Sequence, residues 1–115
     1  MELSMIVWAF AIGNHDAPEL FDAVAETALG RISNFTSISL ANMLWAFGKR
    51  KHAAPELFDA AAEVALENLE DFTPRGLSQT VLAYSLAGHT APNLFDAIAK
   101  IAVERIMDFD MVGVA

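Results

Sequence analysis

The residues best suited to chemistry recur at a fixed spacing: His15, His52 and His89 follow one another at intervals of 37 residues. Imidazole nitrogens are common zinc ligands and bind the ion at roughly 2 Å. Equivalent positions on neighbouring packed helices lie roughly 8–10 Å apart or more, so one ion cannot reach two of these histidines. Since the chain has no cysteine, we predict no metal site, and we expect each histidine to bond a neighbouring backbone group in a turn.

Carboxylates form a second pattern, at i, i+3 and i+7 on two segments. This spacing places them on one face of a helix, where paired acids can transfer protons or bind metal. A third segment has Asn93 and Lys100 at two of these positions, so we predict a solvated face instead. The acids are Glu19, Asp22, Glu26, Glu56, Asp59 and Glu63. No phosphate-binding glycine loop, nucleophile elbow or metalloprotease motif occurs, so we predict no enzyme and no cofactor.

Amides and cations supply the candidate binding residues. Asn42 and Gln79 are 37 residues apart, and helical repeats that read single-stranded RNA use one or a few such side chains per base. Lys49, Arg50 and Arg75 are the cations suited to phosphate contact. We predict an RNA-binding set of these five residues. Two alternatives stay open: the amides are ordinary solvated positions, and the cluster around Arg50 is simply the cationic end of a helix, which the helix dipole favours.

A repeat of 37 residues positions all of these candidates. The pattern HxAPxLFDA begins at each histidine, without insertion, and defines units of about residues 1–35, 36–72 and 73–109, with the start of a fourth at 110–115. Each unit reads as two helices joined by a short polar turn, and a proline stands at the first position of each second helix. We therefore predict one domain, residues 1–115, that is all-α: an α-solenoid of three stacked helix-turn-helix repeats, uncapped at both ends.

The first helix of each unit is expected to carry the contact surface. In the second unit its outward ridge is predicted to be Ser39, Asn42, Ala46 and Lys49, and in the third Gly76, Gln79, Ala83 and Leu86. Trp8, Trp45, Tyr84 and the phenylalanines fall on apolar stripes and are expected in the core, with base stacking as the lesser alternative.

The charge is unevenly distributed along the repeat. The net charge is −8, but the first-helix segments (1–13, 36–52 and 73–89) sum to +3 and the remainder to −11. A polyanion would therefore follow the first-helix surface and be repelled by the other.

The two ends of the chain are apolar and lack the polar capping repeats that solenoids need. We expect either a window from a longer array or a chain whose ends are covered by partners. The longest unbroken apolar run is residues 5–12, far short of the roughly 20 residues of a bilayer span, so we predict no membrane span.

The second unit resembles a known family. Residues 40–47 (LANMLWAF), His52 and residues 54–58 (APELF) are similar to the octotricopeptide repeat and to the related 37-residue heptatricopeptide repeat of organellar proteins. The third unit departs from this pattern at Leu82 and Tyr84. The resemblance implies an α-solenoid of a plastid or mitochondrion that binds RNA and controls transcript stability or translation. Some repeat proteins of this type are instead structural subunits of large assemblies.

Two functions are therefore expected. The first is a single-stranded RNA-binding module, with Asn42 and Gln79 toward the bases and the three cations toward the phosphates. The alternative is a protein–protein scaffold or accessory subunit of an organellar assembly, such as a ribosome or photosystem, with no RNA contact. The resemblance favours RNA; the net charge of −8 and the uncapped ends favour protein.

Overall fold

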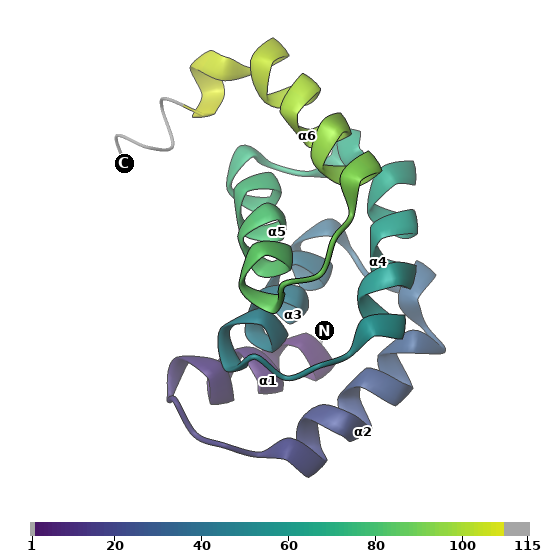
Figure 1. Ribbon diagram of the computed structural model, residues 1–115, viewed down its shortest axis with the longest axis vertical. Coiled ribbons are helices and arrows are strands. Elements are labelled where there is room, and N and C mark those ends of the chain that lie inside the picture. The colour runs from purple at the N-terminus through teal and green to yellow at the C-terminus, as the bar shows by residue number, and fades with distance from the viewer. Residues whose placement is uncertain (1, 110–115) are drawn as a thin grey trace.

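The computed structural model describes residues 2–109, and this part of the chain is helical throughout, with no strand (Figure 1). The fourth-unit start predicted at residues 110–115 lies outside the described residues, as does residue 1. The α-helices are α1 (Glu2–Ile12), α2 (Pro18–Leu29), α3 (Ser37–Arg50), α4 (Pro55–Glu67), α5 (Pro74–Ala87) and α6 (Pro92–Glu104). Short 3-10 helices, Ile32–Asn34 and Leu69–Asp71, follow α2 and α4.

The helix ends follow from local chemistry. The Thr36 and Thr73 hydroxyl oxygens accept hydrogen bonds from backbone amides three residues on, at 3.1 and 3.0 Å, and so cap α3 and α5. Proline stands at the first position of α2, α4 and α6, as predicted. α5 ends at Gly88, whose φ of 67° lies in the left-handed region that glycine adopts without strain.

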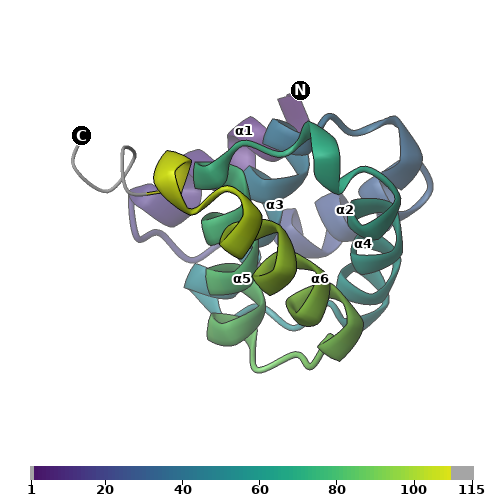
Figure 2. The ribbon, with the colours of Figure 1, turned by 90° about the horizontal axis from the view of Figure 1, so that it is seen from above.

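The helices form two rows. α3 lies between α1 and α5 and packs closely against both; we call these three helices the A row. The B row consists of α2, α4 and α6, in which α4 contacts α2 and α6 less closely. Figure 2 shows the A row on one side of the molecule and the B row on the other. The whole measures 40 × 28 × 25 Å.

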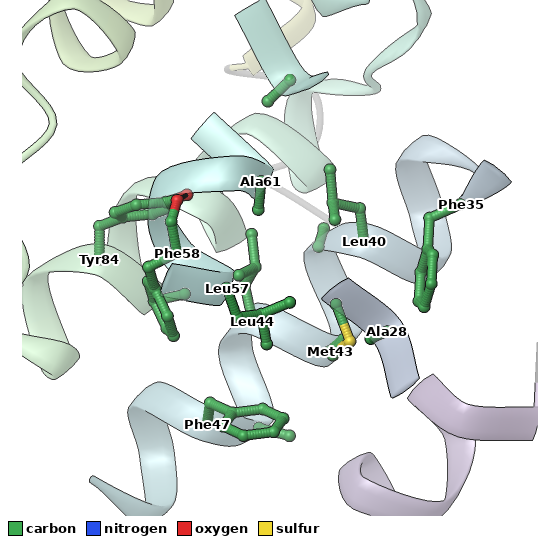
Figure 3. Close-up of a cluster of buried hydrophobic side chains, with 14 of the residues drawn as sticks. Ala28, Phe35, Leu40, Met43, Leu44, Phe47, Leu57, Phe58, Ala61 and Tyr84 are labelled. Atoms are coloured by element: carbon green, nitrogen blue, oxygen red, sulfur yellow. Dashed lines mark hydrogen bonds between the residues drawn. The ribbon is translucent and has the colours of Figure 1, made fainter. Parts of the chain in front are cut away.

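The core fills the space between the rows (Figure 3). Leu40, Leu44 and Phe47 of α3 meet Leu57 and Phe58 of α4, all fully or almost fully buried. Aromatic rings connect successive units by edge-to-face packing: the ring centroids of Phe21 and Phe47 are 5.0 Å apart, and those of Phe58 and Tyr84 are 4.9 Å apart. The predicted core positions are confirmed for Tyr84 and for five phenylalanines, Phe21, Phe35, Phe47, Phe58 and Phe72, whereas Phe10, Phe95 and Phe109 are only partly buried.

The contact between α3 and α5 is unusually close and corrects the predicted outward ridge. Ala46 and Ala83 are fully buried and Ser39 is nearly so, and a Cβ atom at Gly48 would lie 2.6 Å from the Ala83 carbonyl oxygen. Small side chains at these positions allow the helices to approach, so this ridge is the seam between units. Asn42 and Gln79 lie beside it, half-buried.

The two tryptophans are less buried than predicted. Trp8 is 41% exposed and Trp45 is only partly buried, so the core prediction was wrong for Trp8. Successive helical residues are rotated by about 100°, so side chains two positions apart point to nearly opposite sides. Phe47 points into the core between the two rows. Trp45 therefore points to the opposite side of α3, away from the B row.

Candidate binding groove

Three of the five predicted RNA-binding residues lie close together, since Gln79 and Arg75 line one hollow and Asn42 is bonded to Gln79. Asn42 and Gln79 do lie side by side, but the Gln79 amide nitrogen donates to the Asn42 side-chain oxygen at 2.8 Å. This bond crosses from α3 to α5 and joins two units. The amide groups proposed to read bases are therefore engaged, in part, with each other.

The predicted cations are also divided. Arg50 forms an ion pair with Asp16 and donates to the side-chain oxygen of Asn14, so its guanidinium joins α3 to the turn of the preceding unit. Lys49 and Arg75 are exposed and form no hydrogen bond or ion pair with a described residue. They lie at opposite helix ends, since Lys49 is in the last turn of α3 and Arg75 in the first turn of α5.

A groove crosses the outer side of the A row. It runs from the C-terminal half of α1 over α3 to residues 75–82 of α5, and its volume is about 330 Å³. Three in-frame residues, Trp8, Trp45 and Leu82, supply one large side chain from each helix. Trp8 and Leu82 are 41% and 47% exposed. The other lining residues are Ile12, Arg75, Ser78 and Gln79.

The repeat explains the construction of this groove. Positions 8, 45 and 82 each stand two residues before an aromatic residue that packs toward the core. Residues two apart on a helix point to nearly opposite sides, so the side chains at positions 8, 45 and 82 point outward. Close packing of the A row then brings the three outward side chains together. The Trp-Ala-Phe pattern at residues 8–10 and 45–47 contained this signal, although both of its aromatic positions were expected in the core.

The chemistry of the groove suits binding. Its lining is mainly apolar and includes one cation, Arg75, and no carboxylate. Exposed tryptophan presents a large rigid apolar surface with a polar edge, which is the side-chain type enriched where proteins bind partners. Among residues 2–109, no group of histidines and acids is placed to hold a metal ion.

Each histidine bonds a neighbouring backbone group, as expected: the backbone N–H groups of His15, His52 and His89 donate to a carbonyl oxygen five residues earlier, at 3.1, 3.0 and 3.1 Å. The imidazoles of His52 and His89 in addition join units. The Nε2 atom of His52 lies 2.6 Å from an Asp22 carboxylate oxygen, and that of His89 lies 2.7 Å from Asp59. Each pair joins the turn of one unit to the second helix of the unit before it. The acidic face of the B row is exposed, as predicted. Two acids of this face, Asp22 and Asp59, also pair with the histidines that join units.

Tyr84 has no role in the groove. Its hydroxyl donates to the Phe58 carbonyl oxygen at 2.6 Å. Burial raises the pKa of the Tyr84 phenol well above its ordinary value of 10.0, and the Asp59 carboxylate raises it further. The phenol is therefore a structural donor that stays protonated.

No family model, curated protein or solved structure matches the chain. Within the described residues, no helix has both the length and the hydropathy needed to cross a bilayer.

Proposed function

We propose that this chain is an α-solenoid binding scaffold whose partner is a polypeptide segment lying in the groove of the A row. The observation that carries the proposal is the in-frame series Trp8, Trp45 and Leu82, one large apolar side chain per helix in a single hollow. A segment with apolar side chains would bury them there, and an acidic side chain on it would meet Arg75.

The solenoid part of this proposal has support in contacts that recur with the repeat. The His–Asp pairs and the edge-to-face aromatic pairs each occur twice, at positions that differ by 37 residues. In a stack of this kind, each repeat contacts only its neighbours and the outer side of one helix row forms a continuous surface.

Three observations favour a polypeptide over RNA as the partner. Asn42 and Gln79 bond to each other, and Arg50 is paired within the protein. A groove with one cation offers few phosphate contacts, and phosphate contacts supply most of the affinity of non-specific nucleic-acid binding.

The test uses Leu82→Ser, which removes an exposed apolar contact, and Leu66→Ser as the matched control on the B row, where Leu66 is 37% exposed. Partners are captured from a native extract on the full chain, with nuclease present. We expect a fixed set of proteins on the wild type and the control, and at least a tenfold loss with Leu82→Ser. Equal capture by both variants would rule out the groove as the contact.

Single-stranded RNA is the second candidate, because Trp8, Trp45 and Arg75 line the same hollow. Bases stack on aromatic side chains and arginine, with about 1–3 kcal/mol per base. Both tryptophans of the chain lie in the groove, so their fluorescence reports its occupancy. Quenching by oligonucleotide that weakens with salt and is reduced in Arg75→Ala would favour RNA; unchanged fluorescence at low salt would exclude it.

The proposed location is a plastid or mitochondrion, and it follows from the family resemblance. A module of this type would act there on transcripts or within a large assembly. Fractionation of the native source, with detection of the chain in purified organelles, tests this location. Recovery only outside both organelles would contradict it.

A further inference from the structure

Each junction between neighbouring units has a hollow at the same edge of the molecule, beside the turn that joins the two helices of a unit. The hollow between the first and second units has a volume of about 200 Å³, and the hollow between the second and third units has one of about 410 Å³. The six residues that line the smaller hollow all have their equivalents, 37 residues on, in the lining of the larger one. The two hollows are therefore one feature of the repeat, and they differ in the side chains that fill them.

An arginine fills the hollow between the first and second units. The Arg50 side chain is only 16% exposed, forms an ion pair with Asp16 and donates to the side-chain oxygen of Asn14. The chain thus supplies both the cation that enters this hollow and the groups that hold it there.

The hollow between the second and third units lacks this arrangement. At the positions of the arginine, the aspartate and the asparagine it has Ala87, Ala53 and Lys51. Both alanines are exposed, so the space that an arginine occupies in one junction is open in the other. The fixed charge of the wall is also reversed, because a lysine is present and, among the described residues that line this hollow, there is no carboxylate.

Lys51 places its ammonium group beside this hollow. Its Nζ atom donates to the Leu86 carbonyl oxygen at 3.3 Å, so the side chain crosses from the second unit to the third. The ammonium has three donors, and it forms no ion pair with a described residue. Lys51 has a φ of 54°, in the left-handed region, where the other units have Asn14 and Gly88. Asparagine and glycine adopt this conformation more readily than lysine does, so the turn itself does not require a lysine.

Apolar side chains form most of the remaining wall, among them Pro55, Phe58 and Leu86. His52 and His89 line the hollow as well, and each of their Nε2 atoms is bonded to an aspartate of the preceding unit. A mainly apolar wall with one placed charge, around a volume of about 410 Å³, is typical of small-molecule sites, which measure roughly 300–1,000 Å³.

This site does not depend on which units adjoin the second and third. The corresponding hollow between the first and second units still reaches the surface although the third unit follows it, since the Asp16 side chain in its wall is 87% exposed. Stacking a further unit therefore leaves this edge of a junction open.

We propose that the hollow between the second and third units binds a small organic carboxylate with a short, branched apolar body. The carboxylate accepts hydrogen bonds from the Lys51 ammonium, and the apolar body packs on Pro55 and Phe58 in the space between Ala53 and Ala87. A charge-assisted bond of this kind is roughly twice as strong as a neutral one, so the acid binds more tightly than the corresponding alcohol. The site is separate from the groove of the A row, since the two share no lining residue.

The test uses isovalerate as the probe and isoamyl alcohol, which has the same carbon skeleton and no charge, as its control. Lys51→Asn removes the ammonium and introduces the residue that the first unit has at this place, with nearly the same φ of 55°, so folding is retained. Lys49→Asn is the matched control, since it removes the same charge at an exposed position outside the hollow. A third variant, Ala53→Asp with Ala87→Arg, grafts onto this hollow the ion pair that fills the other one.

Histidine ring signals in NMR spectra at constant pH give the readout. On wild-type protein we expect isovalerate to shift the His52 and His89 signals to saturation and to leave those of His15, which lies outside the hollow, unchanged. The affinity for isovalerate should be at least about tenfold lower in Lys51→Asn and in the grafted variant, and unchanged in Lys49→Asn. Wild-type protein should bind isoamyl alcohol at least about tenfold more weakly than the acid.

Four outcomes would each overturn the proposal: wild-type signals that do not move, equal affinities for acid and alcohol, undiminished binding by either hollow variant, or an equal loss in Lys49→Asn. The comparison of acid with alcohol on the wild type needs no substitution, so it decides the question even where a variant is unstable.

Discussion

Gly48 of α3 faces Ala83 of α5 so closely that a Cβ atom on the glycine would stand 2.6 Å from the alanine carbonyl oxygen. The atom in the way belongs to backbone, so a side chain at position 48 can be accommodated only if the two helices move apart. This contact sets the spacing of the A row, and therefore the separation of Trp45 from Leu82 across the groove.

Gly48→Ala is expected to lower the free energy of unfolding by up to about 2 kcal/mol net, because overpacking a close contact usually costs about 1–3 kcal/mol. The gain of about 1 kcal/mol in helix propensity acts in the opposite direction and is smaller than the strain. Urea denaturation measures the difference. The in-frame control is Ser85→Ala, at an exposed position, and should change stability little. A stabilised Gly48→Ala would mean that α3 and α5 are further apart.

The pair of Asn42 and Gln79 should contribute to stability across the seam. Asn42→Ala or Gln79→Ala should each lower the free energy of unfolding by about 0.5–1.5 kcal/mol, because a half-buried hydrogen bond at 2.8 Å is lost. The double substitution should cost less than the sum of the two single ones. Additive costs in this double-mutant cycle would show that the two amides do not interact in solution.

The His89–Asp59 pair is expected to be weaker. The Asp59 side chain is 73% exposed, and exposed pairs contribute roughly 0.2–1 kcal/mol. A cycle of His89→Ala and Asp59→Ala should give a coupling energy in that range. The same cycle on His52 and Asp22 provides the comparison, since that pair has nearly the same geometry, and two very different coupling energies would contradict a repeated contact.

Tyr84 should make stability fall at high pH. The phenol of the unfolded chain ionises near its ordinary pKa of 10.0, whereas burial raises the pKa of the folded phenol. Above pH 10 the unfolded chain therefore releases a proton that the folded chain keeps. The contribution of this group is constant below that pH and is lost above it, by up to about 1.4 kcal/mol per pH unit.

Tyr84→Phe should remove this part of the pH dependence and cost about 1 kcal/mol at neutral pH through loss of the bond to the Phe58 carbonyl. Phenylalanine fits the site, because Phe47 holds the equivalent position in the second unit. Unfolding free energies of both proteins between neutral pH and about pH 11 test this. If the unfolding free energies of the two proteins changed with pH in parallel, Tyr84 would not be buried.

The sequence by itself determined the helices and their order. The proline at the first position of each second helix was predicted from the sequence and is confirmed. Thr36 and Thr73, which cap α3 and α5, depend on the same kind of local chemistry. The exposed acids of the B row were also predictable, because a charge at helical spacing stays in water unless a partner compensates its burial.

Only the tertiary structure decided what each outward side chain meets. Asn42 was expected to face RNA and instead accepts a bond from Gln79, 37 residues away. The His52 imidazole reaches an aspartate of the preceding unit, a contact that local spacing does not show. Trp45 and Phe47 are both large and aromatic, so composition could not tell the groove from the core. The rotation of α3 between α1 and α5 settles that difference, and it depends on how closely small residues such as Gly48 let the helices pack.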